Sequence, residues 1–306
     1  MARAGYTRLM SDAAYPRLRA QVGDWYEDCR SFKWSDNDVV YRDIGEGPPL
    51  LMIHGFPTAG CDWAELVGVL SAHFRLIVPD LLDYGRSENR TGRRWNINDQ
   101  ANMVRDLLRS LDIQAVHIVA HDVGDTVAQE LVARHNDGKL SVRIESLVLM
   151  NGGIFPAHHR ARTFQKLLLS PLGPMLTRVL KKDRFMNALA DVFGPDTRPD
   201  ADARNVLWEV SVGVNGVRSF ARRIHYMKDR LENESRWVGA LKKTALRSMM
   251  INGVEDPVSG GHVCDVIEEE IPAMEVVRLK DIGHFPLLEA PDLCIPPILA
   301  FHGIDA

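Results

Sequence analysis

The segment from Ala115 to Arg134 constrains the fold of this chain more than any other part. It begins with the apolar run 115–119, passes through Ala120-His121-Asp122-Val123-Gly124 and continues as the amphipathic run 125–134. A buried strand, a sharp turn and a helix in this order are typical of a nucleophile elbow, whose strained turn holds one reactive side chain clear of a sheet. The central residue is Asp122. An ordinary helix N-cap is the alternative role for this aspartate.

Short apolar runs recur along the chain and predict further strands. Continuous runs of this kind suit strands that are buried on both faces of a parallel sheet. Helical spacing of apolar residues separates them, as in 98–112. Alternating strands and helices predict an α/β protein with a mostly parallel central sheet and helices on both faces. The predicted strands are 39–42 at the sheet edge, 50–53, 76–78, 115–119, 144–150, 246–251 and 274–279.

The sequence pattern divides the chain into three parts. Residues 1–37 predict an irregular or helical N-terminal arm, and 38–151 with 245–306 predict the α/β core. The helical stretch 152–244 predicts an inserted cap. Residues 151–245 contain 17 Lys and Arg against 9 Asp and Glu, whereas the whole chain has a net charge of −4. This basic surplus either reflects solvated helix faces or attracts anionic substrates and surfaces.

Three carboxyl ends of predicted strands carry side chains for nucleophilic catalysis. A carboxylate such as Asp122 attacks saturated carbon and forms an alkyl ester on the protein. His284, after the last predicted strand, suits activation of the water that cleaves this ester. Asp256 follows the 246–251 strand and would orient the imidazole, although the adjacent Glu255 competes for that role. The order of nucleophile, acid and histidine is that of the α/β-hydrolases.

The same mechanism needs donors for the negative charge that develops when water attacks the ester. His54-Gly55-Phe56-Pro57 follows the 50–53 strand, and its glycine permits a close backbone approach. We expect the backbone N–H groups of Phe56 and Val123 to form an oxyanion hole, with each donor stabilising the intermediate by ~3 kcal/mol.

Composition excludes several other classes of function. A net charge of −4 argues against general nucleic-acid binding, and no apolar run approaches the length of a membrane span. The four cysteines are widely spaced, which favours reduced thiols and a cytoplasmic location. No metal-ligand spacing or GxGxxG pattern occurs, so we expect no metal or cofactor and a small-molecule substrate. His117 and the pair His158-His159 are assigned to packing, and the oligomeric state stays open.

Together these motifs resemble the α/β-hydrolase superfamily, specifically its Asp-nucleophile branch of epoxide hydrolases and haloalkane dehalogenases. The resemblance extends from about residue 38 to 302. A narrower resemblance is to mesoderm-specific transcript protein-like hydrolases. The superfamily motifs are His54–Pro57, Pro79-Asp80 with Gly85-Arg86-Ser87, His121–Gly124, Gly253-x-x-Asp256 and Gly283-His284; those of the subgroup are His121–Leu131, Asn151–Pro156, Val192–Pro195 with Thr197–Pro199, and Arg236–Leu241.

The resemblance also frames the choice of reaction. Haloalkane dehalogenases usually place Trp directly after the nucleophile, where this chain has Val123. Epoxide hydrolases usually donate protons from two lid tyrosines, and Tyr226 is the one tyrosine in 151–245. The resemblance therefore favours hydrolysis of an epoxide to a diol, with Tyr226 as lid donor. Haloalkane or haloacid dehalogenation and non-catalytic ligand binding remain as alternatives. Asp83 departs from the glycine that relatives usually carry.

Overall fold

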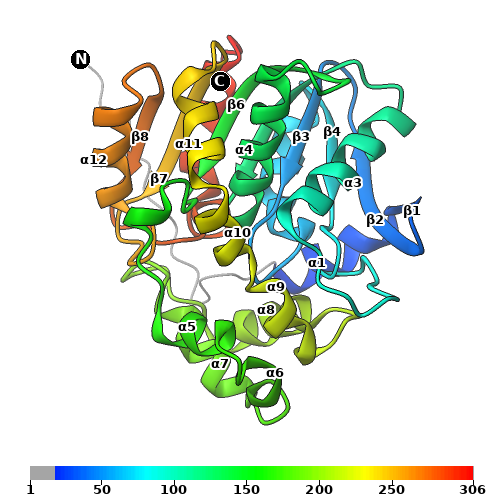
Figure 1. Ribbon diagram of the computed structural model, residues 1–306, viewed down its shortest axis with the longest axis vertical. Coiled ribbons are helices and arrows are strands. Elements are labelled where there is room, and N and C mark those ends of the chain that lie inside the picture. Colours follow the sequence, from blue (N-terminus) through cyan, green and yellow to red (C-terminus); the bar gives the residue numbers. More distant parts are fainter. Residues whose placement is uncertain (1–17, 306) are drawn as a thin grey trace.

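The structure, a computed structural model, describes residues 18–305, and these contain one eight-stranded central sheet (Figure 1). The strand order is β1-β2-β4-β3-β5-β6-β7-β8, with parallel pairing from β4 to β8 and antiparallel pairing of β1 with β2 and of β2 with β4. The predicted α/β class with a mostly parallel sheet is confirmed. The strands are β1 (Arg30–Trp34), β2 (Asn37–Ile44), β3 (Pro49–Ile53), β4 (Arg75–Pro79), β5 (Ala115–His121), β6 (Arg143–Met150), β7 (Arg247–Gly253) and β8 (Glu275–Leu279).

Helices cover both faces of the sheet. On one face α3 (Ile97–Ser110), α4 (Val123–Asn136) and α11 (Glu234–Lys243) pack side by side, in front of the sheet in Figure 1. On the other face α2 (Ala64–Leu70) packs against α14 (Pro291–Phe301). This double cover explains why the central strands read as continuous apolar runs rather than as alternating patterns. The remaining core helices are α12 (Gly261–Glu270), against β7 and β8, and the short α13 (Pro286–Glu289).

Local sequence signals set the ends of these helices. Asn96 precedes α3 and its side chain accepts a hydrogen bond from the N–H of Asp99, while the Asp99 carboxylate accepts one from the N–H of Asn96. This capping box satisfies backbone donors that have no partner within the helix. The helix predicted at 98–112 therefore begins at Ile97.

Part of the predicted N-terminal arm, 1–37, belongs to the sheet. Residues 1–17 lie outside the described residues, and α1 (Leu18–Glu27) is helical as predicted. The prediction of a separate arm is wrong for β1, which pairs antiparallel with β2 and makes β1 the edge strand in place of 39–42. β1 alternates between exposed and half-buried residues. It therefore lacks the continuous apolar run by which the central strands were predicted.

A helical lid lies between β6 and β7, at the lower end of Figure 1. The last helix before β7, α11, instead packs along α4, where the Trp237 indole N–H donates to Glu130 Oε2 at 2.7 Å. The last helix of the cap predicted at 152–244, α11, therefore belongs to the helix layer that covers the sheet and not to the lid. The lid helices are α5 (Thr163–Leu169), α6 (Gly173–Leu176), α7 (Lys182–Ala190), α8 (Ala201–Val212), α9 (Phe220–Arg223) and α10 (Tyr226–Glu232).

Two consecutive arginines of α9 attach the lid to the core. Arg222 donates to both carboxylate oxygens of Asp83, from Nε at 2.9 Å and from Nη2 at 2.7 Å. Arg223 is buried and donates from Nη1 to the backbone oxygen of Pro57 at 3.0 Å. Asp83 has a φ of 75°, a conformation that glycine adopts without strain. The aspartate at this position therefore accepts backbone strain and supplies an ionic partner for the lid.

No helix within residues 18–305 is both long enough and apolar enough to cross a membrane.

Candidate active site

Asp122 lies on a strained turn between β5 and α4. Its φ of 47° and ψ of −102° fall outside the regions that residues with side chains usually occupy. The side chain is almost completely buried beneath the lid, with the residue 3% exposed. The turn brings the carboxylate to the carboxyl edge of the sheet, which is the geometry of a nucleophile elbow.

Two glycines make room for this turn. A Cβ atom on Gly124 would lie 2.2 Å from the backbone oxygen of Ile53, so α4 could not approach β3 as closely with a larger residue. A Cβ atom on Gly55 would lie 2.9 Å from Cβ of Asp122. These contacts explain why the segments His54–Pro57 and His121–Gly124 both need glycine at these positions.

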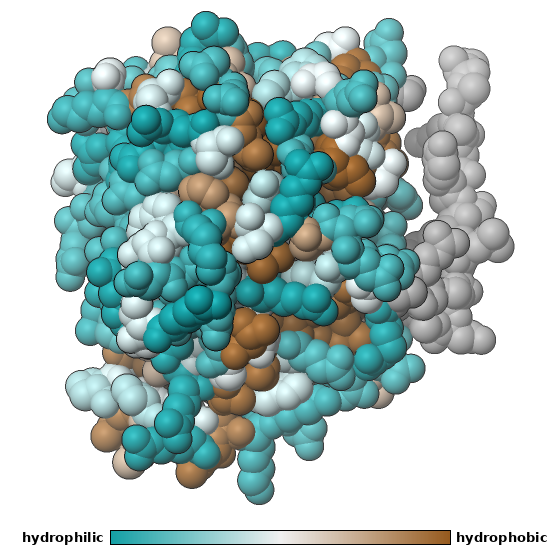
Figure 2. All heavy atoms as spheres, turned by 90° about the vertical axis from the view of Figure 1, so that its right-hand side faces the viewer, coloured by the Kyte–Doolittle hydropathy of each residue, from teal (hydrophilic) through white to brown (hydrophobic). Residues whose placement is uncertain are grey.

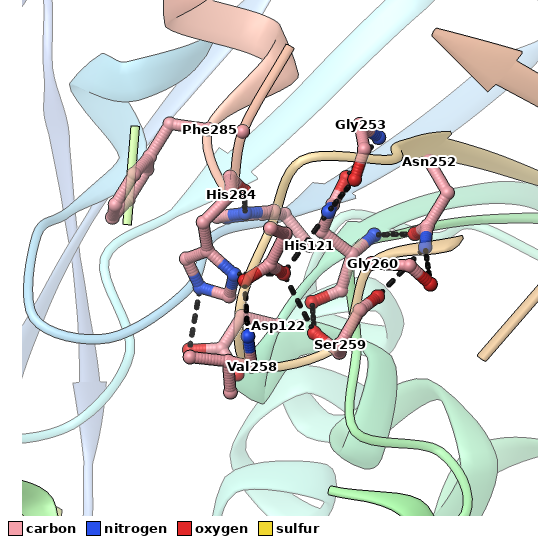
Figure 3. A network of polar contacts seen from close by, with 12 residues as sticks. His121, Asp122, Asn252, Gly253, Val258, Ser259, Gly260, His284 and Phe285 are labelled. Carbon is pink, nitrogen blue, oxygen red and sulfur yellow. Dashed lines mark hydrogen bonds and ion pairs between the residues drawn. The ribbon is translucent and has the colours of Figure 1, made fainter. Parts of the chain in front are cut away.

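His284 reaches Asp122 from the loop after β8 (Figure 3), and Asp256 reaches His284 from the loop after β7. His284 Nδ1 lies 2.7 Å from Asp256 Oδ2, and His284 Nε2 lies 3.9 Å from Asp122 Oδ2. All three residues are buried. Glu255, which competed with Asp256 in the sequence, is exposed. The structure thus brings the three side chains predicted for catalysis into one chain of contacts.

Further donors fix the Asp256 carboxylate. Oδ2 accepts hydrogen bonds from Ser259 Oγ at 2.9 Å and from Asn151 Nδ2 at 3.1 Å, and Oδ1 accepts one from the N–H of Val258 at 2.7 Å. Asn151 directly follows β6 and also pairs with the backbone N–H and carbonyl of Gly253. It ties the end of β6 to the end of β7. Neither Asn151 nor Ser259 was predicted as a site residue.

The two oxygens of the Asp122 carboxylate have different donors. Oδ2 accepts from the backbone N–H of Phe56 at 3.1 Å, and this N–H is one of the two groups predicted to form the oxyanion hole. Oδ1 accepts from Arg230 Nη2, also at 3.1 Å. The same nitrogen donates to the backbone oxygen of Asp122 at 2.8 Å, and Arg230 Nε donates to Thr126 Oγ1 at 2.7 Å. Whichever oxygen becomes alkylated, the other one keeps a donor.

Arg230 is a site residue that the sequence analysis missed. It comes from α10 in the lid, and its side chain is only 2% exposed. It is one of 11 arginines between residues 151 and 245. No spacing rule separates it from the others, because its partner Asp122 lies 108 positions earlier in the chain.

Val123, the second predicted oxyanion donor, is the first residue of α4. Its N–H therefore has no acceptor within the helix. The positive end of the helix dipole lies at the same point and favours negative charge on Asp122. The role of the Val123 N–H as an oxyanion donor stays a prediction.

Asp122, His284 and Asp256 each stabilise the charged form of their neighbours. Burial opposes ionisation of Asp122, but the contacts with His284 and Arg230 outweigh it and lower the pKa of this carboxyl group. Burial likewise opposes the charged form of His284, yet Asp256 and Asp122 raise the pKa of the imidazole to about 10. The pKa of Asp256 is lowered, because His284 and its other donors outweigh burial. The resting site therefore holds an imidazolium between two carboxylates.

A cavity of about 50 Å³ adjoins Asp122 and His284. Tyr226, predicted as lid proton donor, is not among its lining residues. Tyr226 is buried with its ring centroid 6.0 Å from that of Phe56, and it lines a neighbouring cavity with Val123. The Arg230 guanidinium carbon lies 4.6 Å from its ring centroid. Tyr226 lines this neighbouring cavity, and its role as lid proton donor stays a prediction.

The other histidines considered in the sequence have no catalytic geometry. His117 Nδ1 contacts Ser146 Oγ at 2.7 Å on β6. Neither ring nitrogen of His159 has a hydrogen-bond partner within residues 18–305, and burial together with Arg230 lowers the pKa of this imidazole to about 4. No group of three His, Cys, Asp or Glu side chains in the described part of the chain could hold a metal ion.

A sheet of this order, with Asp122, Asp256 and His284 at the ends of β5, β7 and β8, is the architecture of an α/β hydrolase. The family model described as alpha/beta hydrolase fold matches residues 48–189. The chain belongs to this family.

Named relatives agree with this assignment. A mesoderm-specific transcript homolog protein of Bos taurus is 34% identical over 90% of this chain and 86% of its own length. LipZ of Mycobacterium tuberculosis, named as a hydrolase, is 30% identical over 88% of this chain and 94% of its own length. An alpha/beta hydrolase fold protein from Burkholderia ambifaria shares the fold with a TM-score of 0.76 at 19% identity, over 89% of this chain and 97% of its own.

Proposed function

We propose that this hydrolase converts epoxides to diols through an ester formed on Asp122. The observation that carries the proposal is the contact chain Asp122–His284–Asp256 beside the cavity, in which the two carboxylates raise the pKa of the imidazole. An epoxide offers an electrophilic saturated carbon, which a carboxylate can attack. Its leaving oxygen stays attached to the product and must gain a proton. A nucleophile and a proton source side by side meet both needs.

In the first step a carboxylate oxygen of Asp122 attacks a ring carbon and the ring C–O bond breaks. The released oxygen takes a proton from His284 Nε2, which lies 3.9 Å from Asp122 Oδ2. The products are a neutral hydroxyalkyl ester on Asp122 and a neutral imidazole. Of the two candidate donors, His284 is favoured over Tyr226 because it lines the cavity that contains the nucleophile.

In the second step the neutral imidazole acts as a base. Once Asp122 is an ester, His284 has lost one of the two carboxylates that raised its pKa. It can then take a proton from water while the resulting hydroxide adds to the ester carbonyl carbon. The N–H groups of Phe56 and Val123 or the Arg230 guanidinium stabilise the oxyanion. Collapse releases the diol and restores the Asp122 carboxylate and the imidazolium.

Carbon–halogen hydrolysis is the second candidate and uses the same nucleophile. A halide leaves without taking a proton, so His284 would have to lose its proton to solvent before the second step. No tryptophan lines the cavity beside Asp122 in the described structure, and position 123 is valine, so an indole donor for the halide is missing. These observations favour the epoxide reaction.

A substrate panel tests the choice. The purified protein should form diols from styrene oxide and related epoxides, and an Asp122→Ala variant should form none. Halide release from haloalkanes or haloacids without diol formation would instead identify a dehalogenase. Tight ligand binding without turnover, unchanged in Asp122→Asn, would identify a non-catalytic binding protein.

The proposed donor predicts a pH dependence with a definite sign. The rate of ester formation in a single turnover should be flat near neutral pH. It should then fall about tenfold per pH unit above the pKa of His284, near 10, since only the imidazolium donates. Asp122 stays ionised throughout because its pKa is lowered. The measurement is rapid-quench detection of the ester, with circular dichroism to confirm folding at each pH.

A matched variant separates the two candidate donors. Tyr226→Phe should keep both the rate of ester formation and its decline at high pH. If the rate of ester formation instead stays unchanged through the same pH range, His284 acts only as the base of the second step and another group supplies the proton.

A further inference from the structure

The outer end of the lid exposes apolar side chains, which is unusual for a surface facing only water. We call residues 160–184 the lid tip; it contains α5, α6 and the first turn of α7. Leu172, Met175 and Val179 are 55%, 57% and 73% exposed. Figure 2 shows hydrophobic residues in brown at the lower end of the molecule, with hydrophilic residues in teal projecting beside them. Exposed apolar residues that gather in one place mark interaction sites.

Cations without carboxylate partners share the lid tip with these apolar side chains. The lid tip has seven Lys and Arg residues and one acid, Asp183. Within the described structure none of the seven forms an ion pair, whereas other lid arginines, such as Arg222 and Arg236, pair with carboxylates of the core. The basic surplus of the lid is therefore uncompensated at its outer end. The seven residues are Arg160, Arg162, Lys166, Arg178, Lys181, Lys182 and Arg184.

Neighbouring hollows that share lining residues lie between the lid tip and the catalytic cavity. A groove of about 540 Å³ shares Arg162, Phe164 and Ala188 with the cavity beside Asp122. A second groove of about 270 Å³ shares Phe164 with both and is lined by Leu176, Val179 and Leu180. Phe164 thus borders all three spaces. The catalytic cavity of about 50 Å³ is small for a ligand pocket, so the volume for a long substrate lies on the side of the lid tip.

We propose that the lid tip docks on the surface of an anionic lipid bilayer. Leu172, Met175 and Val179 would enter the boundary between headgroups and acyl chains, while the surrounding cations bind lipid phosphates. Apolar side chains flanked by Lys and Arg bind membranes in this way, through apolar burial and attraction to anionic lipids. A neutral apolar surface would leave the cations without a partner. A purely acidic surface would leave the apolar side chains without one.

The grooves that share Phe164 with the catalytic cavity extend this proposal to the substrate class. An amphiphile with an anionic headgroup and a long apolar chain could pass from the bilayer along Phe164 toward Asp122. This extension rests on the proposed function, whereas docking itself does not need a working nucleophile.

Co-sedimentation with lipid vesicles tests the docking. The full chain should bind vesicles of phosphatidylcholine with 30 mol% phosphatidylglycerol and bind pure phosphatidylcholine at least tenfold more weakly. The variant Arg178→Gln/Lys181→Gln/Arg184→Gln should lose on the order of 100-fold in affinity, because each cation near an anionic surface contributes about fivefold. The variant Leu172→Ser/Met175→Ser/Val179→Ser should lose binding at any salt concentration. Asp122→Asn should bind like the wild type, which separates docking from catalysis.

Matched controls use exposed residues far from the lid tip. Leu293→Ser, at a position that is 50% exposed on α14, and Lys139→Gln/Lys280→Gln should bind anionic vesicles like the wild type. Equal binding to both vesicle types, or binding that the lid-tip variants retain, would overturn the proposal. So would a shift from dimer to monomer in the apolar lid-tip variant, because a second copy of the chain would then be the partner.

Discussion

Replacing His284 with glutamine should stop the reaction at the ester on Asp122, so that the covalent intermediate accumulates. Asp122 would keep its donors Phe56 and Arg230 and would still attack the substrate, more slowly because the imidazolium no longer supplies a proton. The ester would then persist, since glutamine cannot take a proton from water. Steady-state turnover should fall by roughly 10³-fold, within the range that general acid–base catalysis contributes.

Intact mass spectrometry of the His284→Gln protein checks this expectation. Incubation with an epoxide should add the full mass of the substrate, because ring opening loses no atom, and peptide mapping should locate the addition at Asp122. A haloalkane adduct would lack the halogen, so the same measurement distinguishes the two reactions. His117→Gln is the matched control, since His117 lies on β5 and contacts Ser146. Wild-type turnover by His284→Gln without an adduct would remove His284 from the mechanism.

The core of this mechanism was predictable from sequence because it depends on local patterns. A buried parallel strand appears as an apolar run, and its carboxyl end faces the site, so Asp122, Asp256 and His284 could be located by what precedes them. Gly124 and Gly55 were predictable for the same reason. Each fills a steric requirement of the turn itself, as the distances to Ile53 and Asp122 show.

Residues whose position depends on the packing of the lid were not predictable. Arg230 and Tyr226 lie on the same short helix, one turn apart, yet only Arg230 contacts the nucleophile. Residues four positions apart share one face of a helix, so periodicity cannot choose between them. The placement of α10 over the core decides which side chain reaches Asp122, and no local pattern in the lid encodes that placement. The edge strand β1 was not predicted from the sequence for a related reason. Its residues are exposed or half-buried, so no apolar run marks it.

Asp83 shows how a departure from a motif can be explained once partners are known. From sequence it was only a departure from the glycine that relatives usually carry at this position. In the structure its carboxylate is the partner of Arg222, so the departure and the basic lid residue account for each other. The pairing spans 139 positions, which exceeds the range of any spacing argument.

Replacing Arg230 with methionine should lower kcat by about 100-fold or more. The guanidinium contacts Asp122 Oδ1 in a site that is closed to solvent, and loss of one donor to a developing oxyanion costs ~3 kcal/mol. The substitution should also raise the pKa of Asp122, because Arg230 is one of the groups that lower it. Since only the ionised carboxylate attacks, the acid limb of the pH–rate profile should move to higher pH.

The pH of the acid limb shows whether Arg230 acts on the ionisation of Asp122 or only on the packing of the fold. Arg236→Met is the matched control, because Arg236 pairs with Glu130 on the covering helices and not with the site. It should leave the limb in place even if it lowers thermal stability. Arg230→Lys should recover part of the rate and return the acid limb toward lower pH. The lysine ammonium lacks the planar fork of donors, but its positive charge still favours the ionised form of Asp122. If Arg230→Met loses activity while the limb stays fixed, Arg230 only supports the fold and the charge on Asp122 is set by His284 alone.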